Sequence, residues 1–339
     1  MPNPPKRILD GDTQFRRGQD SINPLDLTEG YYLRSVNMLN RGGVLQTRPG
    51  YRWIATLPEG EHLQGFTVFR PFEGYPQIIV AIEGSIFRSY YPYEEFKRVE
   101  GVVFSSSARQ VYFAHTVRST SYNEDGSISF IKPLVTLIIQ DGENAPAYYD
   151  GTVFAHLRGA LSTPTGTVMA WSGDRLWVAK GSQIFVSDIN NPVAFTEQTY
   201  NTLGGRQSFT VPHEVTGMAE TPGTSTPQLL VFTQSETFVF QSSVRERDSW
   251  PTLPDFQTKI FDLGAVSSRS IVAMHGVLYW VCNFGLVSFD SAVLSLHSSE
   301  LDFQDNEMAW SKARMNGYMA SIAGCSFENY LILSVPHES

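Results

Sequence analysis

The chain has 339 residues, of which 42% are hydrophobic, 13% are aromatic and only 17% are charged. This composition supplies enough apolar surface for a folded core and excludes an intrinsically disordered chain. The formal net charge of −9 argues against a protein that binds the phosphate backbone of nucleic acids, because affinity for phosphates comes mainly from Lys and Arg. We find no signal peptide, no long apolar run and no Asn-x-Ser/Thr site, so we expect neither a secreted nor a membrane-inserted protein.

The first 60 residues differ in character from the rest of the chain. Prolines crowd residues 1–5 and glycines interrupt the polar stretch that follows, which predicts an extended N-terminal arm. Residues 44–47 read as a short strand, and Arg48-Pro49-Gly50 as a turn that ends the arm. The candidate contact residues of the arm are Arg7, Arg16 and Arg17, for which we favour an acidic protein surface over DNA.

From residue 61 to residue 339 the chain repeats one pattern of short apolar runs separated by turns. In residues 167–188 the runs cover 168–171, 176–179 and 184–186, each too short for a helix and rich in β-branched and aromatic residues. Similar units start near Phe66, Tyr112, Met169, Met218, Ala273 and Ala320, about 46 to 57 residues apart. This period predicts an all-β fold, a β-propeller of about five to seven blades, with the last repeat incomplete at the C-terminus.

The apolar second run of each repeat is expected to be the most buried strand of its blade. The residues predicted to lie there are Leu176, Trp177, Leu229, Val231, Leu278 and Leu331. Cys282 and Cys325 also lie in apolar runs, and two cysteines are too few for a disulfide scaffold, so we expect buried free thiols. We interpret residues 90–100, 190–206 and 244–257 as long connecting loops, and only residues 307–315 as a candidate helix.

Residues 21–55 carry the one family resemblance in the chain. An Asn, a Gly after a basic residue and an Arg-Pro-Gly turn precede the first blade, at Asn37, Arg41, Gly43, Arg48, Pro49 and Gly50. This segment resembles the N-terminal segment of β-propeller proteins in bacteriophage tails, including the nozzle or hub proteins of short-tailed phages. Proteins of that family usually extend beyond the position at which this chain ends.

The resemblance implies a structural virion protein of the phage tail, assembled in the host cytoplasm. It implies a homo-oligomeric ring, most plausibly a hexamer, that forms part of the DNA ejection conduit and a docking platform for adaptor, fibre or tail-tip proteins. DNA would pass through without specific binding, and an excess of acidic residues suits such a surface. Two alternatives stay open: a tail-tip propeller that binds or cleaves host-surface glycans, and a cellular propeller that acts as an interaction scaffold.

The residues give no pattern of a catalytic centre. His213-Glu214 lacks the second His of a zinc protease, and we find neither a Gly-x-Ser-x-Gly elbow nor a phosphate-binding Gly-Lys-Ser/Thr loop. We read Asn123-Glu124-Asp125-Gly126-Ser127 as a hairpin turn rather than a sialidase box. The acidic cluster Asp302, Asp305 and Glu307 could hold a hard cation, but a solvated loop is the favoured interpretation. We therefore predict no enzyme, no metal site and no cofactor.

Overall fold

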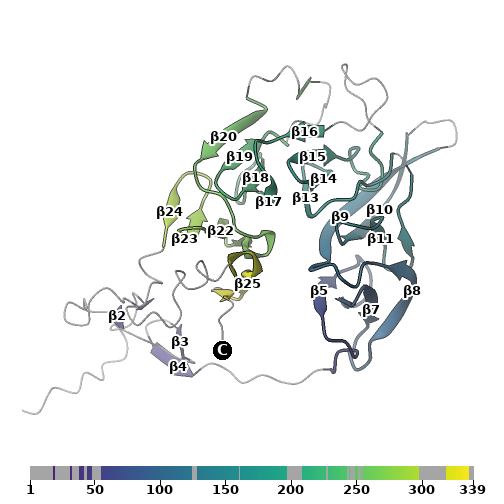
Figure 1. The fold of residues 1–339 in the computed structure, drawn as a ribbon, viewed down its shortest axis with the longest axis horizontal. Helices are drawn as coiled ribbons and strands as arrows, with labels where there is room; N and C mark the ends of the chain where they lie inside the picture. Colours follow the sequence, from purple (N-terminus) through teal and green to yellow (C-terminus); the bar gives the residue numbers. More distant parts are fainter. Residues whose placement is uncertain are drawn as a thin grey trace, which may run out of the picture.

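The computed structural model describes residues 18–19, 31–32, 38–41, 44–47, 55–123, 128–159, 161–196, 208–226, 228–242, 244, 249–250, 253, 255–297 and 318–335. Within these residues the chain forms five four-stranded antiparallel sheets and a sixth, two-stranded sheet, which follow one another around a common centre (Figure 1). We call these sheets blades one to six in chain order. The chain is a β-propeller, and the predicted fold class is confirmed.

Each complete blade runs from an innermost to an outermost strand in chain order. Blade one contains β5 (Leu63–Phe69), β6 (Gln77–Ile82), β7 (Ser85–Ser89) and β8 (Lys97–Val103). Blade two contains β9 (Tyr112–Tyr122), β10 (Ile128–Gln140), β11 (Ala147–Tyr149) and β12 (Phe154–His156). Blade three contains β13 (Val168–Ser172), β14 (Arg175–Lys180), β15 (Gln183–Val186) and β16 (Ser208–Thr210).

The second half of the ring follows the same order. Blade four contains β17 (Val215–Glu220), β18 (Leu229–Thr233), β19 (Thr237–Phe240) and β20 (Gln257–Phe261). Blade five is preceded by the short 3₁₀ helix η2 (Ser268–Ser270) and contains β21 (Val272–Met274), β22 (Val277–Cys282), β23 (Gly285–Phe289) and β24 (Leu294–Leu296). Blade six is preceded by the 3₁₀ helix η3 (Tyr318–Ser321) and contains β25 (Ala323–Phe327) and β26 (Tyr330–Ser334).

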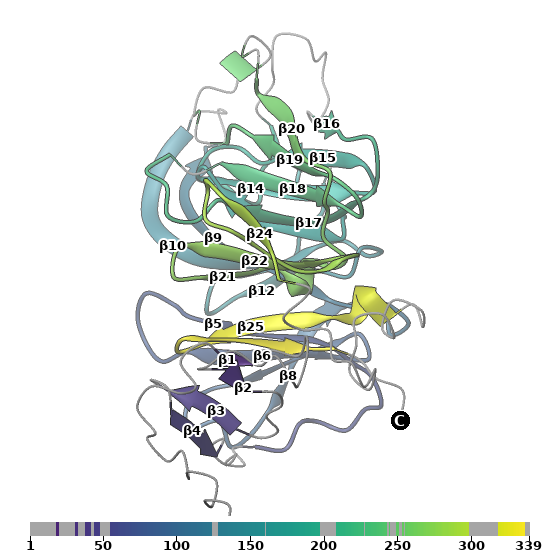
Figure 2. The same ribbon diagram turned by 90° about the vertical axis from the view of Figure 1, so that its left-hand side faces the viewer.

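Four short strands precede the propeller. β1 (Gly18–Gln19) pairs in parallel with β2 (Tyr31–Tyr32), and β3 (Met38–Arg41) forms an antiparallel hairpin with β4 (Val44–Thr47), which confirms the strand predicted at residues 44–47. Figures 1 and 2 both place β3 and β4 on the side of the ring where blade six lies, far from blades three and four.

The repeat period located most of the inner strands correctly. Phe66, Tyr112, Met169, Met218 and Ala273 lie in β5, β9, β13, β17 and β21. Ala320 is the exception: it lies in η3, and the inner strand of blade six begins at Ala323. The predicted three-strand unit was also wrong, because each complete blade has a fourth, outer strand; that of blade one, Lys97–Val103, begins within residues 90–100, which were predicted to be a loop.

The core is divided into apolar layers between consecutive blades. One layer joins each of the pairs one–two, two–three, three–four, four–five and five–six. The layer between blades three and four is rich in aromatic rings: Trp177 stacks on Trp250 with ring centroids 5.5 Å apart. The indole nitrogens of both rings donate hydrogen bonds to backbone carbonyls, at Ser172 and Val244. Both indole N–H groups therefore keep a hydrogen-bond acceptor although the rings are fully buried.

Burial confirms most of the predicted core and corrects two residues. Leu176, Trp177, Leu229, Val231 and Leu278 are all buried in second strands, and Cys282 is buried too. Leu331 lies in a second strand as predicted but is only half-buried. The prediction of a buried Cys325 was wrong, because its side chain is exposed. Both corrections fall in blade six, which packs against blade five through one face only.

Among the described residues, no helix is both long and apolar enough to cross a membrane.

Candidate functional site: the central cavity and the open sector

The innermost strands enclose a cavity of about 420 Å³ at the centre of the propeller. Its walls combine apolar side chains with a few polar groups from loops that lead into the inner strands. The lining includes Gln64, Phe66, Tyr112, Met218, Arg269 and Ala323. They come from five of the six blades, so the cavity is a product of the whole ring.

Gln64 is a structural group in this wall. Its amide nitrogen donates to the carbonyls of Ser105 (2.8 Å) and Ala108 (2.7 Å), and its amide oxygen accepts from the backbone N–H of Gly84 at 2.6 Å. These bonds tie β5 to two neighbouring loops of blade one. Because both ends of the buried amide are occupied, Gln64 is not available to a ligand.

Arg269 lines the cavity, and Arg109 lies close enough for its charge to act on Arg269. Arg109, in the loop before β9, donates from Nη2 to the hydroxyl of Ser321 in η3, and so links the loop after blade one to the start of blade six. Arg269, in η2, has a buried Nε without a hydrogen-bond partner. Burial, reinforced by the positive charge of Arg109, lowers the pKa of Arg269 from its ordinary value. Desolvation raises the pKa of the neighbouring Tyr112 phenol, so Tyr112 remains a neutral donor.

The sector between blade six and blade one carries exposed apolar side chains on both sides. On β5, Gly65 faces the backbone of blade two, so by strand alternation Phe66 and Val68 face the other way. On blade six, Leu331 and Leu333 pack toward blade five, so the opposed pair Cys325 and Ile332 faces away from it. Phe66 is 67% exposed and Ile332 49% exposed. We call these two faces, with Leu63 and Phe327, the seam.

Blade one also presents an aromatic platform at its rim. Tyr75 and Tyr91 stack with ring centroids 4.7 Å apart and are 67% and 60% exposed. Tyr93 meets Tyr91 edge-on, and its hydroxyl donates to the carbonyl of Pro76 at 2.9 Å, which holds the two loops together. Rings held in this way present rigid apolar faces to the solvent.

Blade one and blade two are joined by a buried polar group. The hydroxyl of Tyr149 donates to Gln77 Oε1 and accepts from Arg88 Nη1 at 3.1 Å, while its ring stacks on Phe154 at 3.9 Å. Burial raises the pKa of Tyr149 to about 12. This phenol therefore stays protonated well above neutral pH and acts as a structural donor.

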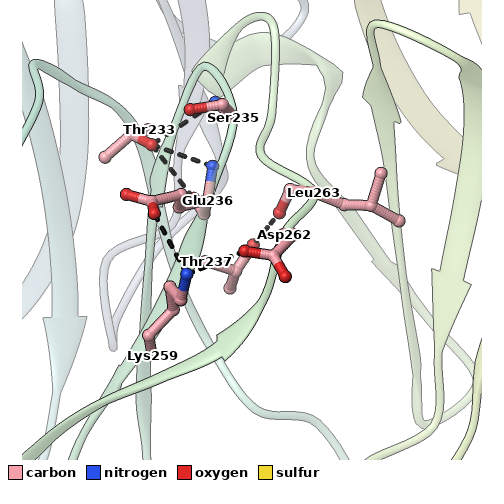
Figure 3. Close-up of polar contacts among 7 residues, drawn as sticks. All are labelled: Thr233, Ser235, Glu236, Thr237, Lys259, Asp262 and Leu263. Carbon is pink, nitrogen blue, oxygen red and sulfur yellow. Dashed lines mark hydrogen bonds and ion pairs between the residues drawn. The ribbon is translucent and has the colours of Figure 1, made fainter.

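A second polar cluster lies at the turn between β18 and β19 and is also structural (Figure 3). The hydroxyl of Thr233 accepts from the N–H of Glu236 at 3.0 Å, which closes the turn, and Thr237 donates to the carbonyl of Leu263. Lys259 bridges Asp262 at 2.8 Å and Glu236 at 3.3 Å, and these hydrogen bonds raise its pKa. The contacts fasten β20 and the following loop to the turn.

Most of the predicted site residues lie outside the described residues. This is so for Arg7, Arg16, Arg17, Asn37, Gly43, Arg48, Pro49 and Gly50, for the acidic cluster Asp302, Asp305 and Glu307, and for the candidate helix at residues 307–315. Arg41 ends β3, where it pairs with Val44. Residues 124–127 of the predicted hairpin turn also lie outside the described residues, while the strands on either side of it pair in antiparallel fashion up to Tyr122 and Ile128. In the described part of the chain, no three His, Cys, Asp or Glu side chains gather as a metal site.

Sequence reasoning missed Arg109, Arg269 and Tyr112. The two arginines lie in separate connections between blades, far apart in the chain, and only the folded propeller brings the charge of Arg109 near Arg269 in the cavity wall. A repeat pattern cannot predict that two connections lie close together, because the connections are the parts that differ from one repeat to the next. The signal in the sequence that could have identified the two arginines is a basic residue just before an inner strand.

Comparison with models of protein families finds no match, and comparison with curated proteins finds none either. Among solved structures, the chain is similar to BBS1N in complex with ARL6DN, at 10% identity over 72% of this chain and 70% of that one, with a TM-score of 0.39. It is also similar to a chain of the nidogen/laminin complex, at 13% identity over 68% of this chain and 76% of that one, with a TM-score of 0.37. The fold assignment rests on the strand topology itself.

Proposed function

We propose that the chain is a non-enzymatic structural propeller of a bacteriophage tail, which acts through assembly with other subunits. The observation that carries an assembly role is the seam, where blade one and blade six expose Phe66, Val68, Phe327 and Ile332. Contiguous apolar surface on a folded ring marks an interaction site more often than it marks a solvent-facing surface. The resemblance of residues 21–55 supports the tail of a phage as the place of assembly.

In this proposal the subunits form a sixfold ring, and the arm of residues 1 to about 50 crosses to a neighbouring subunit or another tail protein. A ring follows when a head-to-tail interface closes on itself. The net charge of −9 supports a conduit that DNA traverses without binding, because few phosphate contacts would form. We therefore expect no measurable affinity of the isolated protein for duplex DNA at physiological salt.

A deletion of residues 1–30 tests this function. We expect the shortened chain to keep the thermal unfolding profile of the propeller, because every blade begins beyond residue 60. It should not form the oligomer that we expect native mass spectrometry to detect for the full chain, and it should be missing from purified phage particles. A full chain that is absent from particles, or a shortened chain that enters them normally, would refute the proposal.

A specific observation also favours the glycan-binding alternative. The rigid Tyr75–Tyr91 platform offers the exposed aromatic faces against which sugar rings can pack. Screening the purified chain and its Tyr91→Ala variant on glycans separates the two functions. Binding that depends on Tyr91 would replace the inert structural role by a receptor-binding one.

A further inference from the structure

A second pocket, of about 390 Å³, lies where the apolar layer between blades four and five meets the loop between β17 and β18. Its apolar walls come from β18, β19, β20 and β23 and include Phe261 and Phe289, which meet edge-on with ring centroids 5.3 Å apart. Its polar groups come from the β17–β18 loop and from the turn after β23. Apolar walls with a few convergent polar groups, in a space of this size, are typical of a small-ligand site.

Two hydroxyl groups hold the polar wall of this pocket in place. Thr221 Oγ1 accepts from the backbone N–H of Gln228 at 2.9 Å, which closes the loop between β17 and β18. Ser291 Oγ donates to the carbonyl of Pro222 at 2.9 Å, which ties the same loop to the turn after β23. The loop is therefore fastened both to its own blade and to the next one.

Two other polar side chains of the lining remain free for a ligand. With the described residues, neither the hydroxyl of Thr226 nor the side-chain amide of Gln228 forms a hydrogen bond. Together they offer hydrogen-bond donors and acceptors beside the apolar walls. A purely apolar ligand would remove these groups from water without pairing them, which is unfavourable.

The pocket offers no charge to a ligand, because none of the described residues that line it is ionisable. Two carboxylates lie nearby in the chain and are already engaged. Asp262, which follows Phe261, is bridged by Lys259 at 2.8 Å (Figure 3). Asp290, which follows β23, accepts two backbone N–H groups of its own turn. An ionic ligand would lose its water here without gaining a counter-charge, so the ligand should be neutral.

A saccharide ring combines these properties, since the C–H groups of its faces can pack against aromatic rings while its hydroxyl groups donate and accept hydrogen bonds. We propose that the pocket between blades four and five binds a neutral saccharide ring, free or at the end of a glycan. Phe261 and Phe289 pack against one face of the sugar. Thr226 and Gln228 form hydrogen bonds with its hydroxyl groups. The site goes beyond the proposed assembly role, which uses the seam, and it is separate from the aromatic platform on blade one.

The test measures sugar binding to the full chain by saturation-transfer NMR and titration calorimetry. The probes are glucose, galactose, mannose and N-acetylglucosamine, neutral oligosaccharides that end in each of them, and the anionic sugars glucuronate and sialic acid. We expect at least one neutral sugar to bind and the anionic sugars not to bind. Gln228→Ala should weaken binding about threefold to tenfold, the effect of one lost hydrogen bond. The matched control is Gln234→Ala, an exposed glutamine in the β18–β19 turn of the same blade, which should bind as the parent does.

Two further variants separate this site from a structural effect and from the platform on blade one. Phe261→Leu keeps an apolar side chain but removes the ring, and it should weaken sugar binding independently of Gln228. Tyr91→Ala should bind the sugar as the parent does. Equal affinity for a free sugar and for the oligosaccharide that ends in it identifies a free saccharide as the ligand, whereas tighter binding of the oligosaccharide identifies a glycan end, and both results support the site.

Three results would overturn the proposal. The first is that none of the neutral sugars binds, or that only the anionic sugars do. The second is that Gln228→Ala and Phe261→Leu both bind with the affinity of the parent. The third is that Tyr91→Ala loses the binding while Gln228→Ala keeps it, which would place the sugar on blade one.

Discussion

The interface between blades three and four and the seam between blades six and one show two ways in which neighbouring sheets of one ring can meet. At the first, Trp177, Phe240 and Trp250 are buried among aliphatic side chains, and the backbones come so close that a Cβ on Gly173 would lie 1.8 Å from the carbonyl oxygen of Ser242. At the second, Phe66 and Ile332 remain exposed. Apolar sequence alone thus does not close an interface, because a partner surface of matching shape is also required.

The largest effect should come from removing the central ring of the closed interface. Trp177→Ala deletes a fully buried indole and its contacts with Phe240 and Trp250, and we expect a loss of about 3–5 kcal/mol in the free energy of unfolding. Chemical denaturation followed by circular dichroism measures this loss. A loss below about 1 kcal/mol would mean that the layer between blades three and four is not packed as described.

The same substitution in two blades sharpens the comparison. Leu229 of β18 and Leu331 of β26 are both in second strands, but only Leu229 is fully buried. Leu229→Ala should cost about 2–5 kcal/mol, and Leu331→Ala no more than half of that, because solvent already reaches its surroundings. Equal losses in denaturant unfolding would show that the sixth blade is closed in solution.

A polar group in the closed interface between blades one and two adds a pH dependence. Tyr149→Phe removes a hydroxyl that donates to Gln77 and accepts from Arg88, and it should cost about 1–2 kcal/mol at pH 8. Burial raises the pKa of Tyr149 from 10.0 to about 12, so its neutral form stabilises the folded state fully below pH 10.

Above pH 10 the unfolded phenol ionises first, and this contribution falls until it is lost as the pH passes about 12. The stability difference between the parent and Tyr149→Phe should therefore shrink between pH 10 and pH 12. Denaturant midpoints measured for both proteins at pH 8, 10 and 11 test the sign; a constant difference would mean that Tyr149 is solvated in the folded state.

The smallest effect on folding should come from the seam itself. Phe66 is 67% exposed, so Phe66→Ser should change the free energy of unfolding by no more than about 0.5 kcal/mol. If the seam is an assembly surface, the same variant should weaken the oligomer in native mass spectrometry. An unchanged oligomer would remove the seam from the proposed function.

The repeats were readable from the sequence because their inner and second strands are continuous apolar runs. The outer strands were not, since a strand such as Lys97–Val103, whose sequence KRVEGVV mixes charged residues with a glycine, looks like a loop when no burial is known. Cys325 was misjudged for a related reason. Its run resembles a buried inner strand, but among the described residues the apolar contacts of blade six lie on its other face, toward blade five, and Cys325 is exposed.

The candidate cavity was beyond sequence reasoning because its lining comes from the inner strands of different blades, which meet only when the blades are arranged around a common centre. Arg109 and Ser321 are 212 positions apart, yet their side chains are hydrogen-bonded in the structure. Contacts of this kind depend on the number of blades and on their tilt. Neither quantity is encoded in the spacing of apolar residues within one repeat.

Because each blade packs mainly on its neighbours, the described propeller resembles an open stack with two ends, and blade six is held by apolar contacts on one side only. Such an end should open by local fluctuation at a lower free energy than the middle of the stack. The two cysteines report this gradient without any label being engineered. Cys325 should react with a thiol reagent immediately, whereas Cys282, whose thiol pKa is raised by burial, should react only when blade five opens. The ratio of the reaction rates of Cys325 and Cys282 would measure how much more often blade six opens than blade five.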